Sequence, residues 1–229
     1  MRVLAKVFFL IDGSIKSETI ANVNSNYVQA TRMPKIGAEA VRRKAMVEAA
    51  IIEIGEAGSL DVTVSQIARR AGMSPALAHH YFGSKDQMFL AAMRHILRLY
   101  GVSVRRRMAG LESPIARIHA IIDASFAPDQ FDREVVAAWL TFYVRALQSE
   151  PASRLLQLYA RRLHSNLVFN LRQIFDGETA ESVAHGLAAL IDGFYIRHAL
   201  QDFGPEQAEV RMMVIDYLDL YLARKATHV

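Results

Sequence analysis

The sequence predicts an all-α protein in which a small three-helix unit near the N-terminus precedes a larger helical bundle. Six prolines, at positions 34, 75, 114, 128, 151 and 205, are spaced widely enough for long helices to fit between them. Apolar residues recur at helical spacing, and no Asn-Gly or Asp-Gly pair joins two alternating runs as a β-hairpin requires. With 52% apolar residues among 229, the chain can also bury a sizeable core.

The predicted helices follow one another with short connections. The first runs from about residue 39 to 57, and Gly58 ends it because glycine readily adopts the left-handed conformation found after a helix C-terminus. Two short helices at 64–71 and 75–82 come next, followed by a long helix at 85–108. The remaining predicted helices are 114–126, 130–149, 151–176, 179–201 and 205–224.

Residues 1–32 differ from the rest of the chain. The apolar run 3–11 resembles the start of a secretory signal, but no small-residue cleavage site follows it. Met33 begins a stretch that has the character of a natural start, so we predict that 1–32 is an extension that is disordered or not native. A basic arm that touches DNA is the alternative interpretation.

Composition and charge exclude some classes of protein and favour others. The chain has no cysteine, which excludes disulfides and thiolate chemistry and suits the reducing cytoplasm. No apolar run approaches the ~20 residues that a membrane-spanning helix needs, so we expect no membrane partner. Residues 33–110 carry a net charge of +6 and residues 111–229 a net charge of −4. A basic segment of this kind favours a polyanionic partner such as nucleic acid.

The segment 63–82 has the sequence of a helix-turn-helix. Thr63, with Gln66 three residues later, is a capping box that starts a helix. Gly72 allows a tight turn, and Ser74 followed by Pro75 is a favourable start for the second helix. In such a unit the second helix enters the major groove of DNA.

The residues expected on the outside of this unit are of types that contact DNA. Histidine and tyrosine side chains bond to base edges or phosphates, small residues approach a groove wall, and basic residues at helix starts reach the backbone. The candidate DNA contacts are Arg42, Arg43, Thr63, Ser65, Ser74, Pro75, Ala76, Leu77, His79, His80, Tyr81 and Lys85. We expect Phe82 to be core, Tyr81 to be partly exposed, and Arg69 and Arg70 to form a solvated face.

Other functional classes fit the sequence less well. The adjacent His79 and His80 have no further ligand at suitable spacing, so no metal site is predicted there, and no cofactor is expected. The chain lacks a glycine-rich phosphate loop, a His-Glu-x-x-His motif and a convincing Ser/His/Asp set, so an enzyme is not predicted.

The run 42–100 resembles the DNA-binding domain of TetR-family regulators. The resemblance lies in Thr-x-x-x-Ile-Ala-x-x-Ala-Gly-x-Ser at 63–74 and in His-Tyr-Phe-x-x-Lys at 80–85. Many members carry Leu-Tyr before the last aromatic pair, whereas this chain has Ala78-His79, which leaves its base contacts open. Segments in the later half resemble the branch of the family that represses glycine betaine synthesis and responds to choline, at 138–143, 162–167 and 186–197.

The resemblance implies a regulatory half that senses a quaternary ammonium effector. Such a cation is best held by an aromatic cage with a carboxylate nearby. The candidate effector residues are Trp139, Phe142, Tyr143, Tyr159, Asp192 and Tyr195, with Phe169 and Phe194 as further walls. The aromatic residues also fit an ordinary core, and Asp192 also fits a pairing with an arginine.

We further predict a homodimer, because an operator with two half-sites requires two reading heads. The helices 179–201 and 205–224 would form a four-helix interface through apolar residues, namely Leu187, Leu190, Ile191, Phe194, Val210, Met213, Val214, Tyr217 and Leu220. The predicted domains are 33–85, which binds operator DNA, and 86–229, which senses the effector and dimerises. The expected function is repression of genes for betaine synthesis and choline uptake. The alternative is a TetR-family regulator of another pathway with another effector.

Overall fold

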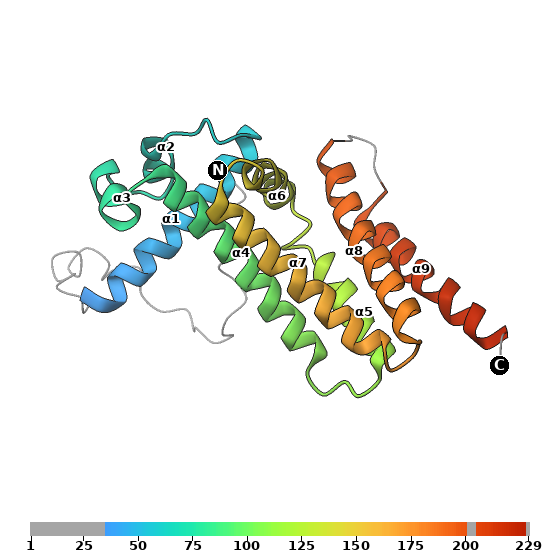
Figure 1. Ribbon diagram of the computed structural model, residues 1–229. Coiled ribbons are helices and arrows are strands. Elements are labelled where there is room, and N and C mark those ends of the chain that lie inside the picture. The colour runs from blue at the N-terminus through green and yellow to red at the C-terminus, as the bar shows by residue number, and fades with distance from the viewer. Residues whose placement is uncertain (1–34, 201–204, 228–229) are drawn as a thin grey trace, which may run out of the picture. The chain divides into compact units, whose positions relative to one another are not determined.

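In a computed structural model, every regular element among the described residues, 35–200 and 205–227, is a helix. This confirms the predicted all-α class. The helices are α1 Lys35–Ala57, α2 Val64–Arg70, α3 Pro75–Phe82, α4 Lys85–Met108, α5 Pro114–Ser125, α6 Arg133–Ala146, α7 Glu150–Leu171, α8 Gly177–Leu200 and α9 Gln207–Thr227 (Figure 1). None of the helices in these ranges is long and apolar enough to cross a membrane.

The chain divides into two compact units, Met1–Ala40 and Val41–Val229. Of the first unit the structure describes only the start of α1, so the predicted extension 1–32 lies outside the described residues. The second unit holds all the other helices and both candidate sites.

Within the second unit, α1, α2 and α3 share a small core with the start of α4. Met46 of α1, Ile67 of α2 and Phe82 of α3 belong to one buried cluster with Met88 and Phe89 of α4. This arrangement positions α3, the predicted DNA-reading helix, on a support of larger helices.

The unit formed by α1, α2 and α3 is called the head below. The long helix α4 continues from the head into a bundle formed with α5 to α9. It contacts α5, α6 and α7, while α8 packs on α6, α7 and α9. The bundle core is rich in large aromatic side chains, and Phe126, Trp139 and Phe142 are among its most deeply buried residues. Trp139 and Phe142, two of the aromatic residues predicted for an effector site, therefore lie in the core of the regulatory half.

Helix ends differ from the prediction where a side chain caps the backbone. The predicted helix 130–149 is the shorter α6, because the Asp132 carboxylate accepts a hydrogen bond from the Glu134 amide at 3.1 Å and starts the helix there. The predicted helix 151–176 ends at Leu171. Asp176 then accepts a bond from the Thr179 amide at 2.9 Å in the first turn of α8.

The outward faces of α8 and α9 also differ from the prediction. Several residues expected at a dimer interface are buried inside the same chain, namely Leu187, Ile191, Val210 and Val214. The exposed large apolar residues of these helices are Ile196, Leu200, Met212, Met213 and Leu220. Both helices are apolar on more than one side, and periodicity alone does not tell which stripe meets the core. The dimer itself stays a prediction.

Candidate DNA-reading head and effector site

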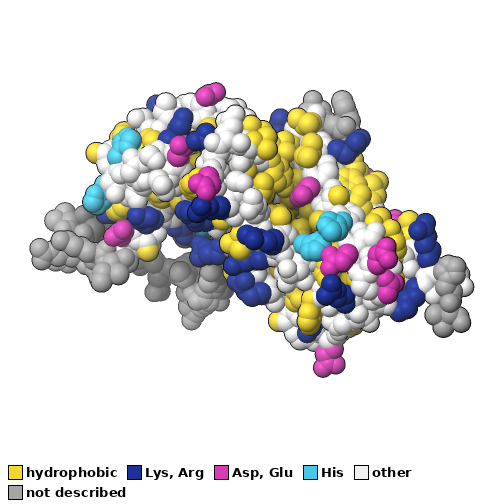
Figure 2. Space-filling model, viewed as in Figure 1, with side chains coloured by type: hydrophobic (Ala, Val, Ile, Leu, Met, Phe, Trp, Pro, Cys, Tyr) yellow, Lys and Arg dark blue, Asp and Glu magenta, His cyan; other side chains and the backbone are white. Residues whose placement is uncertain are grey.

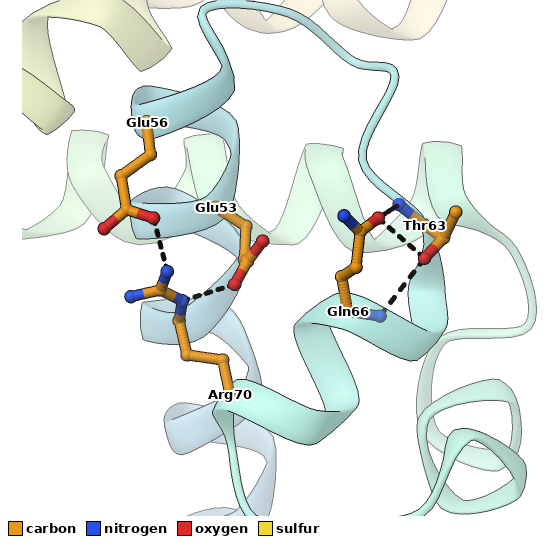
Figure 3. Close-up of polar contacts among 5 residues, drawn as sticks. All are labelled: Glu53, Glu56, Thr63, Gln66 and Arg70. Atoms are coloured by element: carbon orange, nitrogen blue, oxygen red, sulfur yellow. Dashed lines mark hydrogen bonds and ion pairs between the residues drawn. The ribbon is translucent and has the colours of Figure 1, made fainter.

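Local hydrogen bonds build the helix-turn-helix as the sequence predicts. Thr63 Oγ1 accepts from the Gln66 amide at 3.2 Å, and Gln66 Oε1 accepts from the Thr63 amide at 2.7 Å, which completes the capping box of α2 (Figure 3). Gly72 turns the chain at a φ of 68°, which glycine adopts without strain. The Ser74 hydroxyl then caps α3 by accepting from the Leu77 amide at 3.3 Å.

Arg70 ties α2 to α1. Its guanidinium donates from Nε to Glu53 and from Nη2 to Glu56, so a single side chain bridges two carboxylates of α1 (Figure 3). The hydrogen bond with Glu53 is the largest of the effects that raise the pKa of Arg70 above its usual value. Arg69 is exposed as expected, whereas Arg70 has a structural role that the sequence did not reveal.

The exposed face of α3 is small and carries the candidate base-reading residues. Pro75, Ala76, His79 and His80 are exposed, and Leu77 is half-buried. Of the pair that departs from the common family pattern, Ala78 is fully buried and only His79 reaches the surface. The unusual residue at position 78 therefore affects how the head packs. The unusual residue at position 79 lies on the face that would read the DNA.

The expectation that Tyr81 is partly exposed is wrong. Tyr81 is only 8% exposed, and Phe82 beside it is buried as predicted. Arg43 of α1 donates from Nη2 to the Tyr81 carbonyl, and its guanidinium carbon lies 5.8 Å from the Tyr81 ring centre and 5.2 Å from that of Phe82. Arg43 thus holds the end of α3 against α1, with its guanidinium next to the buried Tyr81 and Phe82 rings.

The remaining candidate DNA contacts lie on the surface of the head. Arg42, Thr63, Ser65 and Ser74 are exposed. Lys85 is also exposed, and its ammonium donates to the Leu60 carbonyl at 2.7 Å. An ammonium has three donors, so this bond positions Lys85 and leaves donors for a phosphate.

Three of the candidate effector residues, Phe142, Tyr143 and Tyr159, form an aromatic cluster around Trp139, whereas the Tyr195 ring packs against Phe126 and Phe131. The centre of the Trp139 ring lies 4.9 Å from that of Tyr159, 5.7 Å from that of Tyr143 and 5.7 Å from that of Phe142. Trp139 is 2% exposed, and its indole Nε1 is a buried donor without a hydrogen-bond partner in the described residues. A buried donor without a partner is costly in a folded protein, so an acceptor atom placed at Nε1 would be stabilising.

Asp192 of α8 supplies a carboxylate to this cluster. Its Oδ1 accepts a hydrogen bond from the Tyr143 hydroxyl at 2.9 Å, so within the described part of the chain it pairs with a tyrosine and not with an arginine. Burial raises the pKa of Asp192, and the Tyr143 hydrogen bond opposes that shift. Burial and the nearby Asp192 charge raise the pKa of Tyr143 in turn.

A second polar group lies on the other side of Tyr159. Tyr100 of α4 faces Tyr159 with ring centres 5.7 Å apart, its hydroxyl lies 3.2 Å from Ser125 Oγ, and burial raises its pKa to about 12. Tyr195 donates to the Ser125 carbonyl. The sequence did not single out Tyr100, because its only signal is an apolar position on a long helix. Phe169, expected as a further wall, is 63% exposed and lies outside the cluster.

An open groove between α4 and α7 reaches the edge of this cluster. It has a volume of about 780 Å³, and Tyr100, Tyr159 and Leu163 form part of its wall. Four arginines also line it, Arg94, Arg98, Arg105 and Arg162, and none of its lining residues is acidic. Figure 2 shows Lys and Arg side chains gathering over α4. Sequence reasoning missed this groove, although three of the arginines lie on α4 at helical spacings.

The head and the bundle both match family profiles of one class of regulators. Residues 46–92 match the family described as bacterial regulatory proteins, tetR family, and residues 114–223 match the family described as BetI-type transcriptional repressor, C-terminal. The chain belongs to the TetR family of DNA-binding transcriptional regulators and carries a BetI-type C-terminal domain.

Curated relatives are similar over nearly their whole length. The chain is 55% identical to the HTH-type transcriptional regulator BetI of Brucella anthropi over 190 residues, 83% of this chain and 98% of the relative. It is 49% identical to BetI of Agrobacterium fabrum over 190 residues, 83% of this chain and 92% of that relative. These relatives are regulators and not enzymes, in agreement with the prediction from sequence.

Solved structures share the fold at lower identity. A transcriptional regulator from Saccharomonospora viridis, solved in complex with choline, has a TM-score of 0.70 at 21% identity and covers 79% of this chain and 96% of its own. A TetR regulator from Haloarcula marismortui has a TM-score of 0.70 at 22% identity, with 79% and 98% covered. At these identities the likeness concerns the fold.

Proposed function

We propose that this chain is a homodimeric repressor of genes for glycine betaine synthesis and choline uptake, released from its operator by choline or a related quaternary ammonium compound. The observation that carries the proposal is the half-buried Asp192 carboxylate, which accepts a hydrogen bond from Tyr143 of the Trp139 cluster. The identity to BetI proteins supports the pathway, and the choline bound to the Saccharomonospora viridis regulator supports the effector class.

The chemistry of the cluster suits a cation whose nitrogen has no N–H group to donate in a hydrogen bond. A quaternary ammonium group is attracted to the faces of aromatic rings, and Trp139, Tyr143 and Tyr159 offer three such rings. Burial disfavours the charged form of the Asp192 carboxylate. A bound cation would offset this cost by pairing with the negative charge. The unpartnered Trp139 Nε1 would donate to the oxygen at the other end of the ligand.

On the DNA side, we assign residues 33–85 to operator binding and 86–229 to sensing and dimerisation. Each α3 would enter a major groove with His79 and His80 toward the bases, while Arg42 and Lys85 contact phosphates. Two heads are needed for an operator with two half-sites, and the exposed apolar residues of α8 and α9 are the proposed dimer surface.

Release would follow from the position of α6. This helix carries Trp139 and Tyr143, its start packs on Gly55 of α1, and Arg145 near its end pairs with Asp86 of α4 at 2.9 Å. A ligand that moves α6 would therefore move the head on its support. The two heads of a dimer would then no longer match their half-sites.

The test is a fluorescence anisotropy titration of the DNA upstream of the chain's own gene, with and without choline or betaine aldehyde. A coupling of 1–3 kcal/mol corresponds to about 5–150-fold weaker DNA binding when the effector is present. The neutral analogue in which a tert-butyl group replaces trimethylammonium should have no such effect. Asp192→Asn should abolish the choline response, and Asp216→Asn, an exposed aspartate on α9, is the matched control. DNA binding that ignores both cations would refute the effector assignment.

The arginine-lined groove favours a second candidate, a regulator of another pathway whose effector is an amphipathic anion. Arg94, Arg98, Arg105 and Arg162 would hold the acidic group, and the apolar wall near Leu163 would hold a hydrocarbon chain. Release of DNA by a fatty carboxylate and not by choline, with loss of that response in Arg98→Gln, would select this candidate.

A further inference from the structure

We propose that His164, Glu181 and His185 form a zinc-binding site between α7 and α8. Each residue offers one ligand atom, and these atoms lie within 4.8 Å of one another. On the face shown in Figure 2, histidine side chains gather over α7 and α8 with acidic side chains beside them. None of the three belongs to the head, to the Trp139 cluster or to the arginine-lined groove.

The helical geometry brings the three ligands together. Glu181 and His185 are four residues apart on α8 and therefore share one face, while His164 approaches from α7. The His164 and His185 ring centres are 4.6 Å apart, and His164 Nε2 lies 3.1 Å from Glu181 Oε2. Zinc bonds of about 2.0–2.2 Å in tetrahedral geometry hold donor atoms roughly 3.3–3.6 Å apart, so modest side-chain rotations would bring these three ligand atoms into place.

The surrounding contacts orient the ligands as in a metal site. His185 Nδ1 lies 2.9 Å from the Glu181 carbonyl, which only accepts, so Nδ1 donates this bond and the Nε2 atom is the one that would bind a metal ion. Arg172 donates to Glu181 Oε1 at 2.9 Å, which leaves Oε2 directed at His164. Metal-binding histidines and carboxylates are usually fixed by outer contacts of this kind.

His164 itself lacks a satisfactory partner. Its Nε2 is buried and makes no well-aligned hydrogen bond in the described residues, despite the 3.1 Å contact with Glu181. A metal ion between this nitrogen and the carboxylate would satisfy both. An ion pair between a charged His164 and Glu181 is the competing interpretation, and in it His185 Nε2 would have no role.

The ligand set points to zinc. Two imidazoles and one carboxylate are ligands that Zn²⁺ binds in tetrahedral sites, with water in the fourth position when the protein supplies three. His185 is exposed, so an ion can reach the cluster from solvent. A bound ion would tie α7 to α8 and stabilise the folded chain, because metal binding to the native state adds to its stability.

The test is a zinc titration of the untagged, chelator-treated chain against a chromophoric zinc indicator, with thermal unfolding of the same samples. Wild type should bind one zinc ion tightly per chain and unfold at a higher temperature with zinc than without. His164→Gln and Glu181→Gln should weaken binding at least about ten-fold and lose the thermal shift. His80→Gln, which removes an exposed histidine from α3, should behave as wild type.

His185→Gln keeps the proposal testable if the half-buried His164 variant fails to fold, because His185 is exposed. Far-UV circular dichroism checks the fold of each variant. No tight zinc binding by wild type would overturn the proposal, as would equal binding by wild type and His185→Gln. After either result, His164, Glu181 and His185 would be an ion-pair cluster only. Neither result depends on which effector releases the DNA, so this test is separate from the test of the proposed function.

Discussion

The contact between Gly55 of α1 and the start of α6 leaves no room for a side chain. A Cβ at Gly55 would lie 2.4 Å from the Glu134 carbonyl oxygen, 2.6 Å from its Cα and 2.7 Å from its Cβ. All but one of these are backbone atoms, which cannot rotate away. Gly55→Ala must therefore push α1 and α6 apart.

The size of the effect follows from the distances. Carbon atoms in contact prefer separations of about 3.5–4.0 Å, so the two helices must separate by roughly 1 Å. Overpacking of this kind costs about 1–3 kcal/mol, and the better helix propensity of alanine returns up to about 1 kcal/mol. We expect Gly55→Ala to lower the free energy of unfolding by about 1–2 kcal/mol.

Urea unfolding followed by circular dichroism at one fixed protein concentration measures this loss. Gly101→Ala on α4 is the control, because its Cβ would meet only the flexible end of Arg105 at 3.4 Å. That variant should keep or slightly raise the free energy of unfolding. Equal stability of the two variants would refute the steric argument.

Three further predictions concern the cluster and the head. Choline should bind more tightly as pH rises through the raised pKa of Asp192, because the cation favours the charged carboxylate and binding releases a proton. Calorimetry in a pH series checks this, and Asp192→Asn should give a flat profile. Arg70→Ala should lower the free energy of unfolding by about 1 kcal/mol through loss of its partly exposed ion pairs, while Arg69→Ala should change it little, as urea unfolding will report. Ser74→Ala should lower the same free energy by about 1 kcal/mol by removing the α3 cap, and Ser74→Gly by much less; equal losses would contradict the capping role.

The sequence predicted features that depend on neighbours along the chain. The Thr63–Gln66 capping box and the Gly72 turn are local, so the residue types at fixed spacing are sufficient to define them. The helix 75–82 was predicted with its observed bounds for the same reason. Capping chemistry fixes where a short helix begins, and no distant contact overrides it here.

Features that depend on distant contacts were not predictable in this way. The surroundings of Tyr81 include Arg43 of another helix, and the partner of Asp192 is Tyr143, which lies in α6. A period of 3.6 residues also does not distinguish the stripe of α8 that meets its own core from one that meets a partner. Leu187 was therefore assigned to an interface although it is fully buried within the chain.

The position of α6 connects the two candidate sites in physical terms. Its middle carries Trp139 and Tyr143, and its first turn rests on Gly55 with no compressible side chain between the backbones. If a ligand displaced this helix, no side chain at that contact could rotate to absorb the displacement. The surroundings of Gly101 differ, because only the flexible end of Arg105 lies near that glycine. Packed interiors resist compression, so under the proposed function the motion would pass to α1. Because Arg43 clamps α1 to α3, the DNA-reading helix would move with it. Under the proposed function, Gly55 would then be needed to transmit the motion of α6 as well as to make room for it.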